Sequence, residues 1–92
     1  MTPLDAASRK AFLDQHPDWA ITGETLHRLF VFADFAASIA FVTHIAFAAE
    51  AADHHPDIDI RWNKVTIALT THEVGALTDK DTSLAAVIDA RA

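Results

Sequence analysis

One apolar segment constrains the fold of this 92-residue chain more than any other part of the sequence. Two apolar stripes follow helical spacing there: Phe35, Ile39, Val42, Ala46 and Ala49 form one, and Phe41, Ile45 and Ala48 form the other. Asp34 is a typical N-cap, and Pro56 predicts that the helix ends at about His54, because the residue before a proline avoids helical dihedrals. A helix that is apolar on two sides must be covered on both. We therefore expect a sheet on one side and a partner subunit on the other.

Strand-forming stretches flank this helix on both sides. The clearest is 65–71, where Val65, Ile67 and Leu69 alternate with Thr66, Ala68 and Thr70. This alternation predicts a strand with one buried face. The predicted strands are 19–21, 25–32, 58–62 and 65–71, with turns at 22–24 and 63–64.

Capping patterns near both ends of the chain predict further helices. Thr2 and Pro3 have the residue types of an N-cap and a first helical position, and Pro17 closes the helix that they begin. Near the other end, Thr78 and Asp81 have the spacing of a capping box. The helix that follows is expected to turn four residues inward: Leu84, Ala85, Val87 and Ile88.

These elements predict one α+β domain that spans residues 1–92. Its order is helix, strand, strand, helix, strand, strand, helix, with the helices packed on one face of a four-stranded antiparallel sheet. The hydrophobic content of 51% is enough for one modest core. Because chains this short are marginally stable alone, we expect a homodimer or homotetramer.

Charge and cysteine content exclude several functions. The formal net charge is −6 and the largest basic cluster is Arg9-Lys10, so nucleic-acid binding is not expected. The absence of cysteine excludes disulfides and thiol catalysis. Residues 1–10 lack the apolar core of a signal peptide, and the apolar stretch 35–49 is shorter than a bilayer span. We therefore expect a soluble cytoplasmic protein without a membrane partner.

Three histidines and several acids gather between residues 50 and 81. The two short strands predicted between them would bring both histidine clusters to one end of the sheet. Imidazole titrates near neutral pH, so a pair of histidines can supply an acid and a base to one small molecule. In order, the residues are Glu50, Asp53-His54-His55-Pro56, Thr71-His72-Glu73 and Asp81.

Each of these residues also has a structural interpretation. His54 lies four residues after Glu50 and is suited to capping the helix C-terminus, where the dipole favours a cation. His72 can end its strand by bonding to the backbone, and Asp81 is the acidic member of the capping box, with a second oxygen free to orient His72.

Other histidines and aromatic residues are assigned to structure. His16, His27 and His44 are expected to be structural. Trp62 is the aromatic residue that we expect near a flat heterocyclic ligand. The phenylalanines expected in the core are Phe30, Phe32, Phe35, Phe41 and Phe47.

A metal site is the main chemical alternative. The cluster includes Glu50, His54, His55 and His72, which carry donors that suit zinc or iron. However, adjacent His54 and His55 do not easily point the same way, and no HExxH or facial-triad spacing is present. We therefore predict no metal ligands, and a metal-dependent lyase or sensor remains the alternative.

Taken together, these motifs resemble the pterin-4a-carbinolamine dehydratase family. The resemblance covers most of the chain, and its most specific part is the His-His-Pro run followed by Thr-His-Glu and then an aspartate. The matching stretches are Ala49-Glu50, Asp53-His54-His55-Pro56, Asn63-Lys64-Val65, Thr71-His72-Glu73, Leu77-Thr78 and Asp81, with Trp19 and the Phe30-x-Phe32-x-x-Phe35 run.

The resemblance implies a hydro-lyase that removes water from a 4a-hydroxytetrahydropterin, gives the quinonoid dihydropterin and so supports pterin recycling. It makes His54 and His72 the acid/base pair, with His55 holding and polarising the pterin. Glu50 would support His54, and Asp81 would lie behind His72. The remaining residues implied to line the substrate site are Asp53, Thr70, Thr71 and Glu73. No cofactor is required, since the reaction needs only proton transfers.

The chain departs from the family pattern at a few positions. Gly75-Ala76 stands where many members have the glycine one place later, and Lys80 replaces a frequent arginine. Some members also act as dimerisation partners of a homeodomain transcription factor, and no residue of this chain indicates that role. The non-enzymatic alternative is a dimerisation or binding module that acts through the apolar helix.

Overall fold

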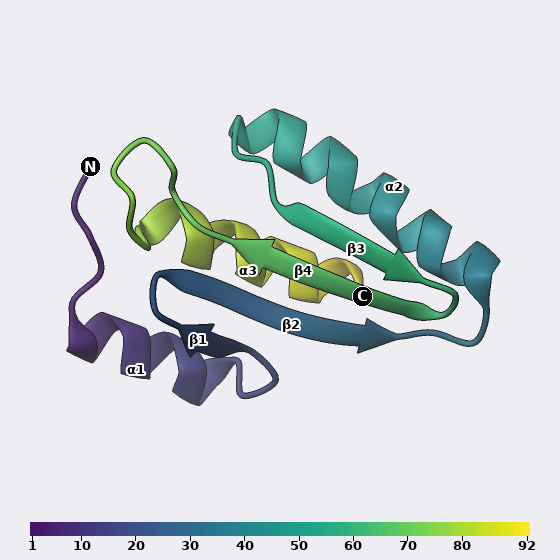
Figure 1. Cartoon of the computed structure of the whole chain (residues 1–92), viewed down its shortest axis with the longest axis horizontal. Coiled ribbons are helices and arrows are strands. Elements are labelled where there is room, and N and C mark those ends of the chain that lie inside the picture. The colour runs from purple at the N-terminus through teal and green to yellow at the C-terminus, as the bar shows by residue number, and fades with distance from the viewer.

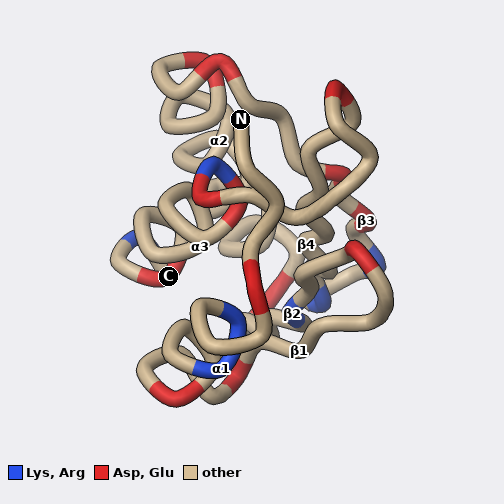
Figure 2. The backbone as a smooth tube through the Cα atoms, turned by 90° about the vertical axis from the view of Figure 1, so that its left-hand side faces the viewer, with Lys and Arg blue, Asp and Glu red and all other residues tan.

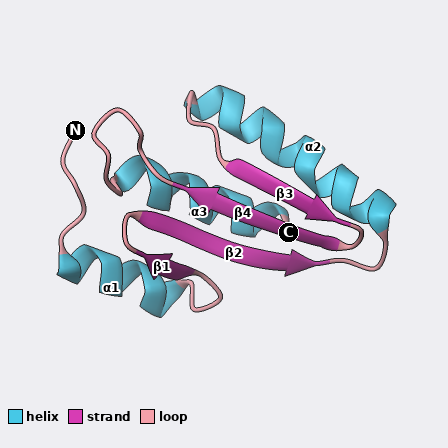
Figure 3. Ribbon diagram, viewed as in Figure 1, coloured by secondary structure: helices cyan, strands magenta, loops and turns pink.

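The computed structural model describes all 92 residues as three helices and one four-stranded sheet (Figures 1 and 3). The order is that predicted, helix, strand, strand, helix, strand, strand, helix. The bounds are α1 Ala6–Gln15, β1 Ala20–Thr22, β2 Thr25–Val31, α2 Phe35–Ala52, β3 Asp57–Arg61, β4 Lys64–Leu69 and α3 Asp79–Arg91.

The sheet is antiparallel throughout, with the strand order β1-β2-β4-β3. Viewed from the side, all three helices lie on one side and the strands on the other (Figure 2), which confirms the predicted α+β class. One face of the sheet is therefore free of helices. Leu29 and Val31 of β2 point to that open face and are 53% and 61% exposed.

The core lies between the sheet and helices α2 and α3. The predicted alternation in β4 is confirmed, because Val65, Ile67 and Leu69 are all buried. The remaining core residues come from every layer: Trp19, Leu26, Phe30, Phe41, Ile45, Ala48, Ala49, Leu77, Leu84, Ala85 and Ile88.

The first helix begins later than the sequence predicts. Asp5, and not Thr2, is the N-cap, and its carboxylate accepts the backbone N–H of Ser8 at 2.7 Å. Residues 1–4 lie outside any helix or strand, and the N–H of Leu4 donates to the carbonyl of Leu77 at 2.8 Å. The predicted start was wrong because this long-range contact holds the N-terminal residues against the segment before α3.

Helix α2 carries an outer apolar face in addition to its buried one. Asp34 is its N-cap, as predicted. Phe35 and Phe47 were expected in the core, but they are 53% and 72% exposed, and Val87 of α3 is 40% exposed. By length and composition alone α2 could cross a membrane, a test that core helices of soluble proteins also pass. Here its inner side packs against the sheet and α3 through Phe41 and Ile45.

Candidate active site

Both histidine clusters lie at one end of the sheet, as predicted. Asp57 at the start of β3 pairs with Ala68 near the end of β4, so residues 53–55 and 70–73 meet there. They line a polar cleft of about 120 Å³. The lining residues are Asp53, His54, His55, Thr70, His72 and Glu73. We refer to this site as the polar cleft.

A C-terminal cap on α2 places His54 in the cleft. Asp53 adopts the left-handed conformation at φ 48°. The N–H of Asp53 donates to the carbonyl of Glu50 and the N–H of His54 donates to that of Ala49, both at 3.1 Å, which is the Schellman pattern. The helix therefore ends at Ala52, before the end predicted from Pro56, and His54 leaves the helical spiral.

His54 forms a buried pair with Asp81. The distance between its Nε2 and Oδ1 of Asp81 is 2.5 Å, and the side chains are 7% and 0% exposed. Asp81 was expected to lie behind His72, and this expectation was wrong. The capping box that holds Asp81 at the start of α3 is confirmed, and the carboxylate bonds the His54 ring and the Thr71 hydroxyl, not the His72 ring.

Thr71 and Thr78 complete the surroundings of Asp81. Thr71 Oγ1 donates to Oδ2 of Asp81 at 2.8 Å, and the backbone N–H of Thr78 donates to the same oxygen at 3.0 Å. The hydroxyls of Thr71 and Thr78 are 2.8 Å apart. Thr71 has no exposed surface, so it cannot line the substrate site as the family resemblance implies.

Glu50 contacts His55 and not His54. Its Oε1 lies 2.6 Å from Nε2 of His55, and both side chains are exposed, at 77% and 59%. The spacing of four residues favours a pair between Glu50 and His54 only while the helix continues through His54. Because the helix ends at Ala52, His54 turns inward and His55 takes that position.

His72 lies on the loop after β4 and is exposed. The loop is closed by the bridge between Thr71 and Ala76, and Gly75 takes a left-handed conformation at φ 63°. The His72 ring makes no hydrogen bond within the protein, so both of its nitrogens are available. Three imidazoles thus share one cleft: His54 is buried and paired, while His55 and His72 are open to solvent.

Trp62 does not contribute to the cleft. It occupies the turn between β3 and β4, next to the pair Arg61 and Lys64, whereas the cleft lies at the Asp57–Ala68 end of the same strands. Its ring is 66% exposed. The hairpin therefore places Trp62 at the opposite end of β3 from the histidines, although it follows them closely in sequence.

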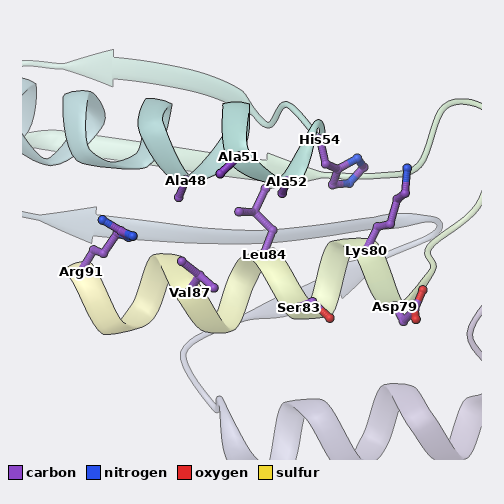
Figure 4. Close-up of a pocket in the computed structure, with 10 residues that line it drawn as sticks. All are labelled: Ala48, Ala51, Ala52, His54, Asp79, Lys80, Ser83, Leu84, Val87 and Arg91. Carbon is purple, nitrogen blue, oxygen red and sulfur yellow. The ribbon is translucent and has the colours of Figure 1, made fainter.

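A second, larger hollow lies between α2 and α3. It has a volume of about 470 Å³ and a floor of small and apolar residues. His54 and Lys80 lie at one end and Arg91 at the other (Figure 4). The only sequence signal for this hollow, called the groove below, is the spacing of Ala48, Ala51 and Ala52 by three and four residues. His54 lines both the groove and the polar cleft.

We take the polar cleft as the candidate reactive site because ionisable groups converge there. No cluster of three or more His, Asp or Glu side chains has an arrangement that suits a metal ion. Neighbouring imidazoles in different surroundings can act as proton donor and proton acceptor toward one bound molecule. The arrangement is therefore suited to acid/base chemistry.

Comparison with known proteins gives a consistent picture. The family model described as "Pterin 4 alpha carbinolamine dehydratase" matches residues 2–91. A protein of Chloroflexus aurantiacus provisionally named pterin-4-alpha-carbinolamine dehydratase is 56% identical over 89 residues, which cover 97% of this chain and 96% of that protein. A protein of Thermosynechococcus vestitus with the same provisional name is 49% identical over 85 residues, with coverage of 92% and 90%.

Solved structures share the fold. A crystal structure titled transcriptional coactivator/pterin dehydratase from Brucella melitensis has a TM-score of 0.94 at 29% identity and covers 99% of both chains. A pterin dehydratase-like protein identified as a RuBisCO assembly factor in the alpha-carboxysome has a TM-score of 0.66 at 24% identity, covering 79% of this chain and 84% of that one. The second likeness indicates the fold alone.

Proposed function

We propose a dehydratase function from one premise: the chain belongs to the pterin 4 alpha carbinolamine dehydratase family. The proposed reaction removes water from a 4a-hydroxytetrahydropterin. The C4a–O bond breaks as the hydroxyl receives a proton, N5 loses its proton, and a C4a=N5 bond forms. The products are water and the quinonoid dihydropterin. Because no electrons are gained or lost, the reaction requires no redox cofactor.

The observation that supports this proposal most directly is the convergence of His54 and His72 on the polar cleft. We assign the two proton transfers to this pair, since groups that titrate near neutral pH can serve as either acid or base. Asp81 holds His54 from behind at 2.5 Å, an arrangement that fixes the orientation of the ring.

The other residues of the cleft are assigned to substrate binding. His55, with Glu50 at 2.6 Å, is placed to hold and polarise the pterin. Asp53, Thr70 and Glu73 supply polar groups around the same opening. Thr71 is left out of this set because it is buried.

The proposal is tested by following the dehydration of freshly generated 4a-hydroxytetrahydropterin by ultraviolet absorbance. His54→Ala and His72→Ala should each reduce the rate by roughly 100- to 10,000-fold, the usual contribution of a general acid or base. His27→Ala is the matched control, because His27 lies on β2, contacts Thr22 and is not among the residues that line the cleft. Circular dichroism establishes that each variant is folded. Unchanged turnover in folded His54→Ala and His72→Ala would refute the assignment.

We also propose that the protein is a homo-oligomer assembled through the outer face of α2. Phe35, Ile39 and Phe47 lie on that helix and are 53%, 38% and 72% exposed. An exposed set of large apolar side chains is typical of a protein interface. Phe47→Glu should shift the mass measured by light scattering toward the monomer. Ala11→Glu, at an exposed position of α1, tests whether an added charge alone has this effect.

A binding module is the second candidate function, and the same outer face of α2 favours it. The crystal structure with a TM-score of 0.94 is titled both coactivator and pterin dehydratase. This alternative predicts that Phe47→Glu abolishes partner binding while His54→Ala and His72→Ala leave it unchanged. Absence of dehydration by the folded wild type would make it the leading interpretation. In either case we propose a cytoplasmic location, which is supported by the packing of the inner side of α2 into the core.

A further inference from the structure

We propose that Thr71 is a positioning residue: it holds Asp81, which in turn holds Nε2 of His54 and leaves Nδ1 to exchange a proton with the substrate. This inference rests on the dehydratase function proposed above, in which His54 is an acid/base group. It comes from a network of four buried side chains that joins the end of β4, the start of α3 and the end of α2. Its members are Thr71, Thr78, Asp81 and His54.

The hydrogen bonds of Asp81 fix the proton on His54. Oδ2 of Asp81 accepts two hydrogen bonds, from the Thr71 hydroxyl at 2.8 Å and from the Thr78 backbone N–H at 3.0 Å. Oδ1 lies 2.5 Å from Nε2 of His54. An ionised carboxylate can only accept, so Nε2 must carry the hydrogen. The neutral ring is therefore the Nε2–H tautomer, and Nδ1 carries a lone pair.

The direction of the hydrogen bond between the two threonine hydroxyls follows from the number of protons that they carry. A threonine hydroxyl has a single proton, and that of Thr71 is engaged with Asp81. In the 2.8 Å contact between the two hydroxyls, Thr78 must therefore donate and Thr71 accept. Thr78 Oγ1 accepts in turn from the backbone N–H of Lys80 at 3.3 Å. The chain of donors thus runs from Thr78 through Thr71 to Asp81.

Nδ1 of His54 is free to meet the substrate. It makes no hydrogen bond within the protein, and Arg28 Nε is the one buried side-chain nitrogen or oxygen without a partner. Nδ1 therefore reaches the surface, and His54 lines the polar cleft. When neutral, Nδ1 accepts the proton that leaves N5 of the pterin. When the ring is protonated, the same nitrogen delivers a proton to the departing hydroxyl.

Thr71 acts only through Asp81. Its side chain is fully buried and cannot touch a molecule in the cleft. Loss of its hydroxyl leaves Oδ2 with one donor instead of two and frees Asp81 to turn. The effect should appear in kcat, because the reacting nitrogen is misplaced, while KM stays within about twofold because the substrate contacts are intact.

The test combines steady-state kinetics with a measurement of the His54 tautomer. The tautomer is read from long-range ¹H–¹⁵N NMR spectra of protein labelled with ¹⁵N-histidine, recorded near pH 8. Thr71→Val keeps the shape and removes the hydroxyl, and Thr71→Ser restores the hydroxyl. Thr66→Val, at an exposed position of β4, the strand that leads to Thr71, is the matched control. A His54→Gln spectrum identifies the His54 signals among the six histidines of the chain.

Wild type should show the Nε2–H tautomer of His54. Thr71→Val should lower kcat by roughly 10- to 100-fold, the effect of one hydrogen bond to a charged group, with Thr71→Ser close to wild type. Asp81→Asn should invert the tautomer. Two donors converge on the Oδ2 position, so the amide oxygen occupies it and the amide NH₂ donates to Nε2, which leaves the hydrogen on Nδ1.

Two results would overturn the inference. One is an Nδ1–H tautomer in wild type, and the other is a folded Thr71→Val protein with wild-type kcat. The tautomer is read without turnover, so it separates this inference from the proposed function. A wild type that shows the Nε2–H tautomer but does not dehydrate the pterin would refute the function and support the network.

Discussion

Replacing Asp81 by alanine should destabilise the protein more than any other single change of a carboxylate. Asp81 has no exposed surface and accepts hydrogen bonds from three groups: His54 Nε2, the Thr71 hydroxyl and the Thr78 N–H. The Thr78 bond belongs to the capping box of α3. Alanine leaves all three donors buried without an acceptor.

The expected loss follows from these three contacts. Hydrogen bonds to a charged group contribute about 1.5–3 kcal/mol each, and removal of the carboxylate recovers several kcal/mol of desolvation. Breaking a buried pair from one side therefore costs about 3–5 kcal/mol net. A chain of this length has a total stability of roughly 5–14 kcal/mol, at about 0.05–0.15 kcal/mol per residue. The melting temperature should fall by roughly 12 °C or more.

Urea unfolding followed by circular dichroism measures the loss. Asp79→Ala is the matched control, because Asp79 lies in the same first turn of α3 but is exposed, and it should lose only about 0.3–1 kcal/mol of helix-dipole interaction. Asp81→Asn retains an acceptor for Thr71 and should fall between the two. If Asp81→Ala were no less stable than Asp79→Ala, the account of the buried network would be incorrect.

Three further changes test other parts of the structure. Asp89→Ala should cost about 2–3 kcal/mol in urea unfolding, because Asp89 accepts from Trp19 Nε1, Arg28 and His16 at 2.7–2.9 Å and so joins α3 to β2 and the β1 region. Hydrogen bonds from Arg9 and from the N–H of Leu77 hold the pKa of Glu24 below its usual 4.5, so its contribution to stability is present above about pH 4.5 and is lost as the pH falls through the lowered value. Stability measured in urea should consequently fall less steeply with acid in Glu24→Gln, and identical pH profiles would contradict this. Gly75→Ala should cost about 1–2 kcal/mol at its φ of 63° and reduce kcat/KM by displacing His72. Gly23→Ala, at φ 59° and not in the cleft lining, should lose a similar amount of stability with unchanged kcat/KM.

Local chemistry made much of the fold predictable. The alternation of Val65, Ile67 and Leu69 specified which face of β4 is buried, because side chains in a strand alternate between faces. Asp34 specified the start of α2, and the spacing of Thr78 and Asp81 specified the start of α3, because a cap and the N–H that it bonds lie within three residues. Helix α1 was placed too early, since its N-terminus is fixed by a contact with Leu77 that no local pattern encodes.

The candidate site was predictable as a set of residues but not as a set of contacts. The two histidine clusters share a cleft because the strands between them form a hairpin, and a hairpin returns the chain to where it began. The same geometry places Trp62 at the far end, although it is close to the histidines in sequence.

The sequence by itself determined the order of the elements and the buried face of β4, because each depends on neighbours within a few positions. It also determined the group of residues at the cleft, because a short hairpin joins the two histidine clusters. Only the tertiary structure decided that Asp81 holds His54, that Glu50 holds His55 and that Thr71 is buried. These pairings depend on one left-handed residue, Asp53, which ends α2 and reverses which histidine faces inward. They depend equally on the packing of α3 beneath that end, which brings together side chains 27 residues apart.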